Sequence, residues 1–215
     1  MKIVSLLFGA LSAVSAAATG VQPVTTDEIR GFNVSSVLPE GYTAVPFSMD
    51  VALEPGGEKM TFNGTVTEIL AQIQSIKPDF TWNRTASAPS STEVSKPKLN
   101  KSNILCKIPG QTNAYRWVIL GGYDFLVNIN QDCKVDSGPR KCAMLYCLTG
   151  NSIWMCNDNK TPISRSCSSI ASYVLDIIGT FSCTTPGSMG PGTLLQGQEF
   201  DTDGFNVLAG GGGCE

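Results

Sequence analysis

The distribution of cysteines constrains this chain more than any other feature. Seven of the eight cysteines fall between Cys106 and Cys183, and the eighth is Cys214. Such a local density is typical of small domains that disulfides stabilise in an oxidising compartment. Because seven cysteines cannot all pair with one another, parity predicts that Cys214 completes the set; a free thiol or an intermolecular disulfide is the alternative. The predicted disulfide cysteines are Cys106, Cys133, Cys142, Cys147, Cys156, Cys167, Cys183 and Cys214.

The first residues predict export from the cell. Residues 1–16 combine the charge of Lys2 with an apolar run and a small-residue site at Val14–Ala16, which is the pattern of a cleavable signal peptide. A buried N-terminal helix is the alternative, but the Ala/Ser-rich end suits a signal peptidase better than a packed core. No later apolar run is long enough to span a bilayer, and the last residues lack the apolar tail of a GPI signal. We therefore expect a secreted, extracellular protein without a membrane anchor.

Export would also expose the Asn-x-Ser/Thr sequons to glycosylation. Asn159 is the weakest of them because Pro162 directly follows its Thr161. The predicted N-glycosylation sites are Asn33, Asn63, Asn83, Asn100 and Asn159.

The chain divides into two unlike halves on either side of a polar segment. Residues 85–103 are rich in Ser, Thr and Pro and have few apolar side chains, which is typical of a linker. Residues 17–84 predict a hairpin around Pro55–Gly57 and one amphipathic helix, which begins at a capping box from Thr65 to Glu68 and ends before Pro78. We expect this less ordered N-terminal region to pack against the second half of the chain or to form a loosely ordered pro-region.

The cysteine-rich half, residues 104–183, predicts a small α+β domain. Its patterns indicate a helix over about 119–129, strands at 142–148 and 152–156 joined by a tight turn, and a helix over about 168–181. This order predicts a disulfide-stapled sandwich of helices on an antiparallel sheet. The last segment, residues 184–215, is rich in glycine, and we expect it to be mostly disordered apart from Cys214.

Residues 138–183 resemble a group of small cysteine-rich secreted proteins of filamentous fungi. In that group a Cys-x4-Cys segment leads into an aromatic strand that ends in Cys-Asn-Asp-Asn, followed by an Ile-Ala helix closed by a cysteine. Cys106 resembles the upstream cysteine of the group, whereas Cys133, Cys167 and Cys214 look additional. The resemblance implies a candidate effector, and the order of elements is also similar to that of α/β-sandwich killer toxins. The matching positions are Cys142, Cys147, Trp154, Cys156, Asn157, Asp158, Asn159, Ile170, Ala171 and Cys183.

The chain contains no histidine, which removes the commonest catalytic chemistries. A Ser-His-Asp triad, a Cys-His dyad and a histidine ligand for zinc are all impossible. The formal net charge of −3 gives no reason to expect nucleic-acid binding. Cys142 and Cys147 have zinc-finger spacing, but disulfides are favoured in an oxidising compartment. We predict no catalytic residue, no cofactor and no metal site.

Because histidine is absent, paired carboxylates are the remaining means of acid/base catalysis. Glycoside hydrolysis needs only two carboxyl groups. The acids of the expected domain lie in no recognisable motif, so solvated charge is the favoured interpretation. Asp158, between two amide side chains, is expected to cap a turn rather than to bind Ca²⁺, which prefers six to eight oxygen ligands. The acids considered are Asp124, Asp132, Asp136, Asp158 and Asp176.

The aromatic residues of the second half could form a binding platform or fill the core, and the core is favoured for Trp154. Our leading hypothesis is a secreted, non-enzymatic, effector-like interaction protein that binds a host or competitor protein or glycan through its loops. The alternatives are a small secreted hydrolase with a carboxylate pair and a structural protein of the cell wall or matrix. The aromatic residues are Tyr115, Trp117, Tyr123, Phe125, Tyr146 and Trp154.

Overall fold

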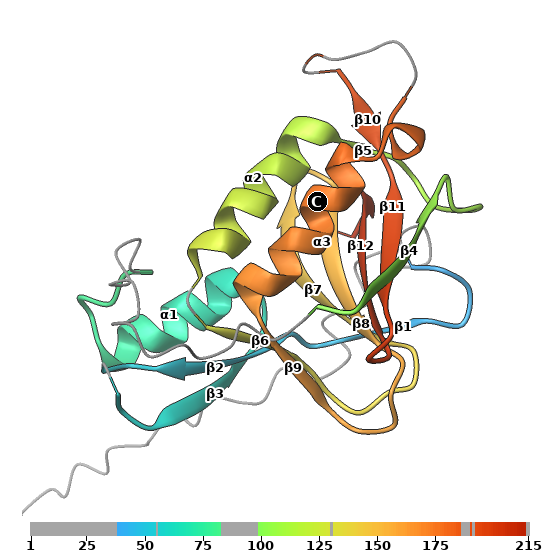
Figure 1. The fold of residues 1–215 in the computed structure, drawn as a ribbon. Coiled ribbons are helices and arrows are strands. Elements are labelled where there is room, and N and C mark those ends of the chain that lie inside the picture. The colour runs from blue at the N-terminus through green and yellow to red at the C-terminus, as the bar shows by residue number, and fades with distance from the viewer. Residues whose placement is uncertain are drawn as a thin grey trace, which may run out of the picture.

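Figure 1 shows the computed structural model, in which three helices lie against two β-sheets and a short ribbon. The structure describes residues 38–54, 56–82, 99–129, 131–185, 190 and 192–213. The predicted α+β class is confirmed. The expected signal peptide, the sequons at Asn33 and Asn83 and residues 85–98 of the expected linker lie outside the described residues.

A six-stranded sheet forms the larger layer of the fold, in the order β1-β7-β8-β12-β11-β4. β1 is parallel to β7, and all other neighbours are antiparallel. The predicted hairpin is present between β7 and β8, where Thr149 and Gly150 have the positive φ angles that a tight two-residue turn requires. The strands are β1 (Thr43–Val45), β4 (Lys101–Cys106), β7 (Lys141–Leu148), β8 (Asn151–Asn157), β11 (Gly197–Asp201) and β12 (Phe205–Gly211).

A four-stranded antiparallel sheet, in the order β3-β2-β6-β9, joins the two halves of the chain. β2 and β3 form the hairpin predicted around Pro55–Gly57, and β2 also pairs with β6 of the cysteine-rich half. The N-terminal strands are therefore part of a shared sheet. The strands are β2 (Ser48–Ala52), β3 (Lys59–Asn63), β6 (Asp132–Val135) and β9 (Ile163–Ser166); β5 (Ala114–Tyr115) and β10 (Leu194–Leu195) form the ribbon.

The three helices begin where the local sequence predicts, or a few residues earlier. α1 (Val66–Ile76) has the predicted capping box, in which Thr65 N donates to Glu68 Oε2 at 2.6 Å and Glu68 N donates to Thr65 Oγ1 at 3.3 Å. α2 (Arg116–Asn128) and α3 (Cys167–Gly179) lie side by side across the larger sheet (Figure 1). A short 3-10 helix, η3 (Phe181–Cys183), follows α3. None of the helices described has the length and apolar character needed to cross a bilayer.

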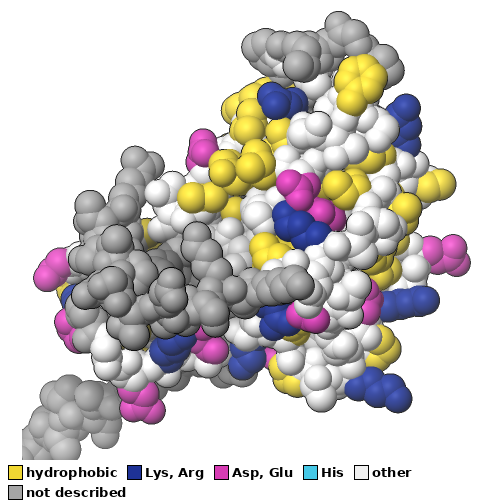
Figure 2. All heavy atoms as spheres, viewed as in Figure 1, with side chains coloured by type: hydrophobic (Ala, Val, Ile, Leu, Met, Phe, Trp, Pro, Cys, Tyr) yellow, Lys and Arg dark blue, Asp and Glu magenta, His cyan; other side chains and the backbone are white. Residues whose placement is uncertain are grey.

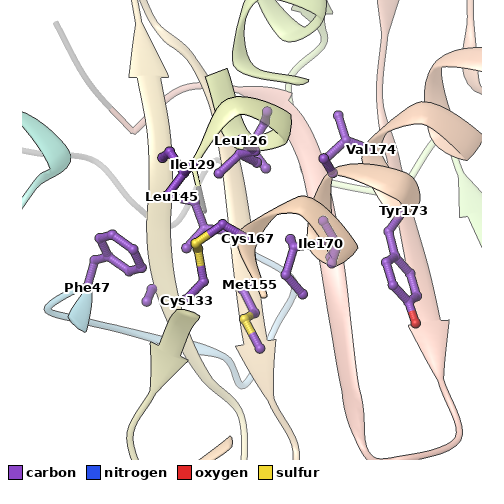
Figure 3. Packing of buried hydrophobic residues seen from close by; sticks show 14 of the residues in the cluster. Phe47, Leu126, Ile129, Cys133, Leu145, Met155, Cys167, Ile170, Tyr173 and Val174 are labelled. Carbon is purple, nitrogen blue, oxygen red and sulfur yellow. A yellow bond between two sulfur atoms is a disulfide. The ribbon is translucent and has the colours of Figure 1, made fainter. Parts of the chain in front are cut away.

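The main core lies between the α2–α3 pair and the larger sheet. Figure 3 shows Leu126 of α2 and Ile170 and Val174 of α3 above Leu145 and Met155 of the sheet, all of them buried. A smaller cluster on the opposite face contains Trp154 and Leu208 with the Cys142–Cys156 disulfide. The prediction that Trp154 fills the core is thus confirmed.

Three disulfides join pairs of cysteines that both lie in the described residues. Cys142–Cys156 bridges neighbouring strands, Cys133–Cys167 joins the four-stranded sheet to the start of α3 (Figure 3), and Cys106–Cys183 joins β4 to η3. Cys133 and Cys167, which looked additional to the fungal group, are therefore partners of each other. Cys147 is also disulfide-bonded, and Cys214 lies outside the described residues.

The expectation of a mostly disordered C-terminal segment is wrong for residues 192–213. β11 and β12 are inner strands of the larger sheet, and nearly all of their residues are buried. The glycines serve close packing: a Cβ on Gly197 would lie 2.7 Å from Ile177 Cγ2. Lys101–Asn103 of the expected linker likewise belong to β4.

Candidate functional site

The strongest concentration of ionisable groups lies between α3 and the C-terminal strand β11. Side chains alternate along a strand, so Gly197, Glu199 and Asp201 all face α3. Tyr173 and Asp176 on α3 and Lys101 on β4 meet them there. We call Lys101, Tyr173, Asp176, Glu199 and Asp201 the α3–β11 cluster.

Hydrogen bonds and one ion pair organise this cluster. Lys101 Nζ lies 2.5 Å from Asp176 Oδ2 and 4.6 Å from the centre of the Tyr173 ring. Tyr173 is fully buried and donates its hydroxyl to Asp201 Oδ2. Glu199 is 3% exposed, and its Oε2 has no hydrogen-bond partner among the described residues.

The electrostatics of the cluster favour protonation of Glu199. Burial raises the pKa of Glu199 from 4.5 to about 7; Lys101 opposes the rise, whereas Asp176 and Asp201 add to it. Asp176 adds to the rise both through its charge and as a hydrogen-bond partner of the protonated carboxyl group. Burial and the bond to Asp201 raise the pKa of the Tyr173 hydroxyl as well, which keeps it a donor.

A hollow of about 480 Å³ lies next to the cluster, between β9 of the smaller sheet and the β11–β12 turn. Arg165 forms one wall: its Nη2 lies 2.9 Å from Asp203 Oδ2, and its guanidinium carbon lies 5.4 Å from the centre of the Phe205 ring. Asp201 belongs to both the cluster and the hollow. We call this space the junction hollow; its lining residues are Leu99, Asp132, Ser164, Arg165, Ser166, Asp201 and Asp203.

The Cys-Asn-Asp-Asn segment forms a turn, as predicted, but its capping side chain is Asn157 and not the expected Asp158. Asn157 Nδ2 donates to the carbonyl oxygens of Asp136 and Thr161 at 2.9 and 2.8 Å, and Asn157 Oδ1 accepts from Asn159 N at 2.9 Å. Asp158 Oδ2 accepts hydrogen bonds from Tyr42 and Asn206. Burial and the neighbouring Asp158 raise the pKa of Tyr42 to about 12. The described residues contain no group of three or more Cys, Asp or Glu placed to hold a metal ion.

Of the five acids considered from the sequence, Asp176 alone lies in the α3–β11 cluster. Asp124 and Asp136 are exposed, and Asp132 pairs with Lys59 at 2.6 Å. Asp176 keeps the solvent contact that was predicted, with 45% of its side chain exposed, but it also meets Lys101 and Glu199. Glu199 and Asp201 were not among the predicted site residues because residues 184–215 were expected to be mostly disordered. The residues of β11, Gly-Gln-Glu-Phe-Asp, carry no apolar–polar alternation that would indicate a buried strand.

Exposed aromatic side chains gather at the end of the molecule where α2 begins and η3 follows α3. Tyr115 is 49% exposed, Trp117 54% and Phe181 75%. β10 lies between β5 and the segment that follows η3, because Leu194 pairs with Tyr115 and its carbonyl accepts from Thr185 N at 2.9 Å. Figure 2 shows hydrophobic side chains over α2 and near this end. We call Tyr115, Trp117 and Phe181 the apolar end; Tyr123, Phe125 and Tyr146 are partly buried in the core.

The predicted glycosylation sites within the described residues differ in the hydrogen bonds that their side-chain amide groups make. Asn63 is exposed on β3, and its Oδ1 accepts from Ser48. Asn100 Nδ2 donates to Asp203 Oδ1 at 3.2 Å. Asn159 Nδ2 donates to the carbonyl oxygens of Asp203 and Gly204 at 2.8 and 3.0 Å, so both hydrogen bonds hold the β11–β12 turn.

No protein-family model, no curated protein and no solved structure matches this chain. The function must therefore be argued from the geometry.

Proposed function

We propose that this chain is a secreted, non-enzymatic interaction protein, effector-like, built as a disulfide-stapled α+β sandwich. It acts on a host or competitor macromolecule, either a protein or a glycan. The observation that carries the proposal is the apolar end, where three aromatic side chains are between 49% and 75% exposed. Secretion is supported by the disulfides together with the predicted signal peptide.

The apolar end has the properties of a recognition surface. Exposed aromatic side chains supply a large apolar area at a small cost in side-chain entropy, and Trp and Tyr are enriched among the residues that dominate binding energy. The surface is also held firmly, because Cys183 of the Cys106–Cys183 disulfide lies two residues after Phe181 and β10 pairs with β5. A rigid platform loses little entropy when a partner docks.

Binding measurements on Trp117→Ala and Phe181→Ala test the proposal. Labelled full-length secreted protein is titrated onto host and competitor cell-surface fractions. We expect each substitution to weaken binding about tenfold, as for central aromatic contacts, without a change in melting temperature. Met60→Ala, which removes an exposed apolar side chain from β3, is the matched control and should bind like the wild type. Equal binding by all four proteins would exclude the apolar end as the docking surface.

A small hydrolase with a carboxylate pair is the second candidate, and the contact between Asp176 and Glu199 favours it. A carboxyl group whose pKa is raised to about 7, with a second carboxyl group beside it, supplies the proton donor of general acid catalysis. Against this, Glu199 is 3% exposed and Lys101 forms an ion pair with Asp176. A substrate would have to displace Lys101 to reach the carboxyl pair. Polysaccharide hydrolysis that disappears in both Glu199→Gln and Asp176→Asn would establish this candidate over the first.

A further inference from the structure

We propose that the junction hollow binds an organic cation, the ammonium or guanidinium group of a basic side chain. The hollow measures about 480 Å³, which exceeds the space that one such side chain needs. It lies at the start of α3, whereas the apolar end lies beyond the other end of this 13-residue helix, about 20 Å away. The site is therefore independent of the proposed docking surface.

One carboxylate of the hollow has no ion pair. Asp132 pairs with Lys59 at 2.6 Å, and Asp203 pairs with Arg165 at 2.9 Å. Asp201 lies opposite Lys101 across β11 and β4, but Lys101 pairs with Asp176, so Asp201 has no ion pair among the described residues; it is 6% exposed. A buried carboxylate is costly unless charge-assisted bonds compensate it, so an incoming cation gains most at Asp201.

Asp201 is also held in position before any ligand arrives. Its Oδ2 accepts the hydroxyl of Tyr173, and its Oδ1 accepts from Asp203 N at 2.7 Å. Each carboxylate oxygen offers two lone-pair directions, so one further hydrogen bond to each remains possible. The carboxylate can therefore receive an ammonium or guanidinium group without giving up its internal bonds.

The remaining wall suits the stem of a basic side chain. Leu99 offers apolar contact for methylene groups, and the hydroxyl of Ser164 offers an acceptor for a remaining N–H donor. Long basic side chains bury their stems in this way while the charged head finds an acceptor.

An anion is disfavoured in the same space. Arg165 is the one cation in the wall, and its donors are engaged by Asp203 and by the Ser164 carbonyl oxygen at 2.9 Å. The first amides of α3 are engaged as well, since Cys167 N donates to Gln131 O and Ser169 N donates to Ser166 Oγ. Three carboxylates would repel a phosphate or a carboxylate ligand.

The test uses small probes and the full-length protein. N-acetyl-lysine methylamide and N-acetyl-arginine methylamide are titrated while the amide signals of Ser164, Arg165 and Asp203 are followed by NMR. N-acetyl-glutamine methylamide, N-acetyl-aspartate and glucose serve as neutral, anionic and sugar probes. We expect the two basic probes alone to shift these signals, with dissociation constants of about 1–10 mM, as for fragments of this size.

Two variants separate recognition of the cation from general effects of charge. Asp201→Asn removes the receiving charge, and Ser164→Lys places a cation of the protein in the hollow while leaving the bonds of Asp201 intact. Both should weaken the basic probes at least tenfold, the scale of a lost charge-assisted bond. Ser75→Lys on the exposed side of α1 adds the same charge elsewhere and should leave binding unchanged.

The proposal is wrong if the basic probes cause no shift of the amide signals at about 100 mM, which is 10 times the expected dissociation constant. It is also wrong if the glutamine, aspartate or glucose probe causes an equal shift. A Ser164→Lys protein that binds the basic probes as tightly as the wild type would overturn it as well. Because no probe contacts Trp117 or Phe181, failure here leaves the binding test of the apolar end unaffected, and the reverse also holds.

Discussion

Glu199 couples the stability of the fold to pH through a single carboxyl group. Its pKa of about 7 in the folded protein lies above the ordinary 4.5, so the folded state binds the proton more tightly than the unfolded state does. Stability from this group is complete below about pH 4.5 and declines as pH rises through 7. The groups that face it are Lys101, Asp176 and Asp201. We expect the free energy of unfolding to fall by about 2 kcal/mol between pH 5 and 8.

Glu199→Gln tests this dependence, because glutamine has a similar shape and does not titrate. Denaturant unfolding at several pH values, with the disulfides intact, should show that the substitution removes most of the slope. Glu58→Gln, which changes an exposed carboxyl group before β3, should retain the slope. A Glu199→Gln protein with the slope of the wild type would show that other groups govern the pH dependence.

Asn159 and Asn63 are expected to differ in glycosylation. A glycan on Asn159 replaces one hydrogen of an amide nitrogen that already donates to two carbonyl oxygens. Asn63 lies exposed on β3. Glycopeptide mass spectrometry of the secreted protein should find Asn63 occupied and Asn159 unoccupied; substantial occupancy at Asn159 would contradict the hydrogen bonds at the β11–β12 turn.

At the scale of elements, the packing of α3 on β11 depends on Gly197. A Cβ there would lie 2.7 Å from Ile177 Cγ2 and 2.9 Å from Cys183 Sγ, both of which are fixed in the core. We expect Gly197→Ala to destabilise the protein by about 1–3 kcal/mol, the usual cost of overpacking. Gly179→Ala at the end of α3, where a Cβ meets nothing within 4 Å, is the control and should be nearly neutral in thermal unfolding. Equal melting temperatures for the two variants would contradict the tight contact.

The elements that the sequence predicts are those whose causes are local. The capping box of α1, the turn between β7 and β8 and the apolar stripe of α3 each lie within a few residues, so their patterns are visible in one stretch. β4, β6 and β11 escaped prediction because their partners are distant in the sequence and half or more of the residues in each strand are polar.

The same reason limits prediction of the candidate site. Asp176 lies on a predicted helix and could be named, although as a solvated charge. Glu199 and Asp201 gain their burial from strands that pair over long distances, and nothing in their own neighbourhood signals this. The junction hollow likewise needs both sheets, so it exists only in the assembled fold.

For the whole molecule, the C-terminal strands are indispensable. β12 lies between β8 and β11, so removing residues 194–215 would make β8 an open edge, leave β4 without its partner β11 and delete Phe205 and Val207 from the core. We expect the truncated chain to lack cooperative unfolding and amide protection, because the lost burial is comparable to the whole stability of a domain. Hydrogen exchange on the truncated protein checks this; native-like protection in β7 and β8 would contradict the central role of β12.

The order in which the strands leave the ribosome gives this arrangement a kinetic consequence. β4 and β8 are made long before β11 and β12, and neither can complete its ladder until those two strands have been synthesised. Folding by such distant pairings is slow, and open strand edges favour association in the meantime. The larger sheet must therefore remain incomplete until β12 has been synthesised, and the Cys142–Cys156 hairpin, closed by residues close in sequence, is the element best placed to form first.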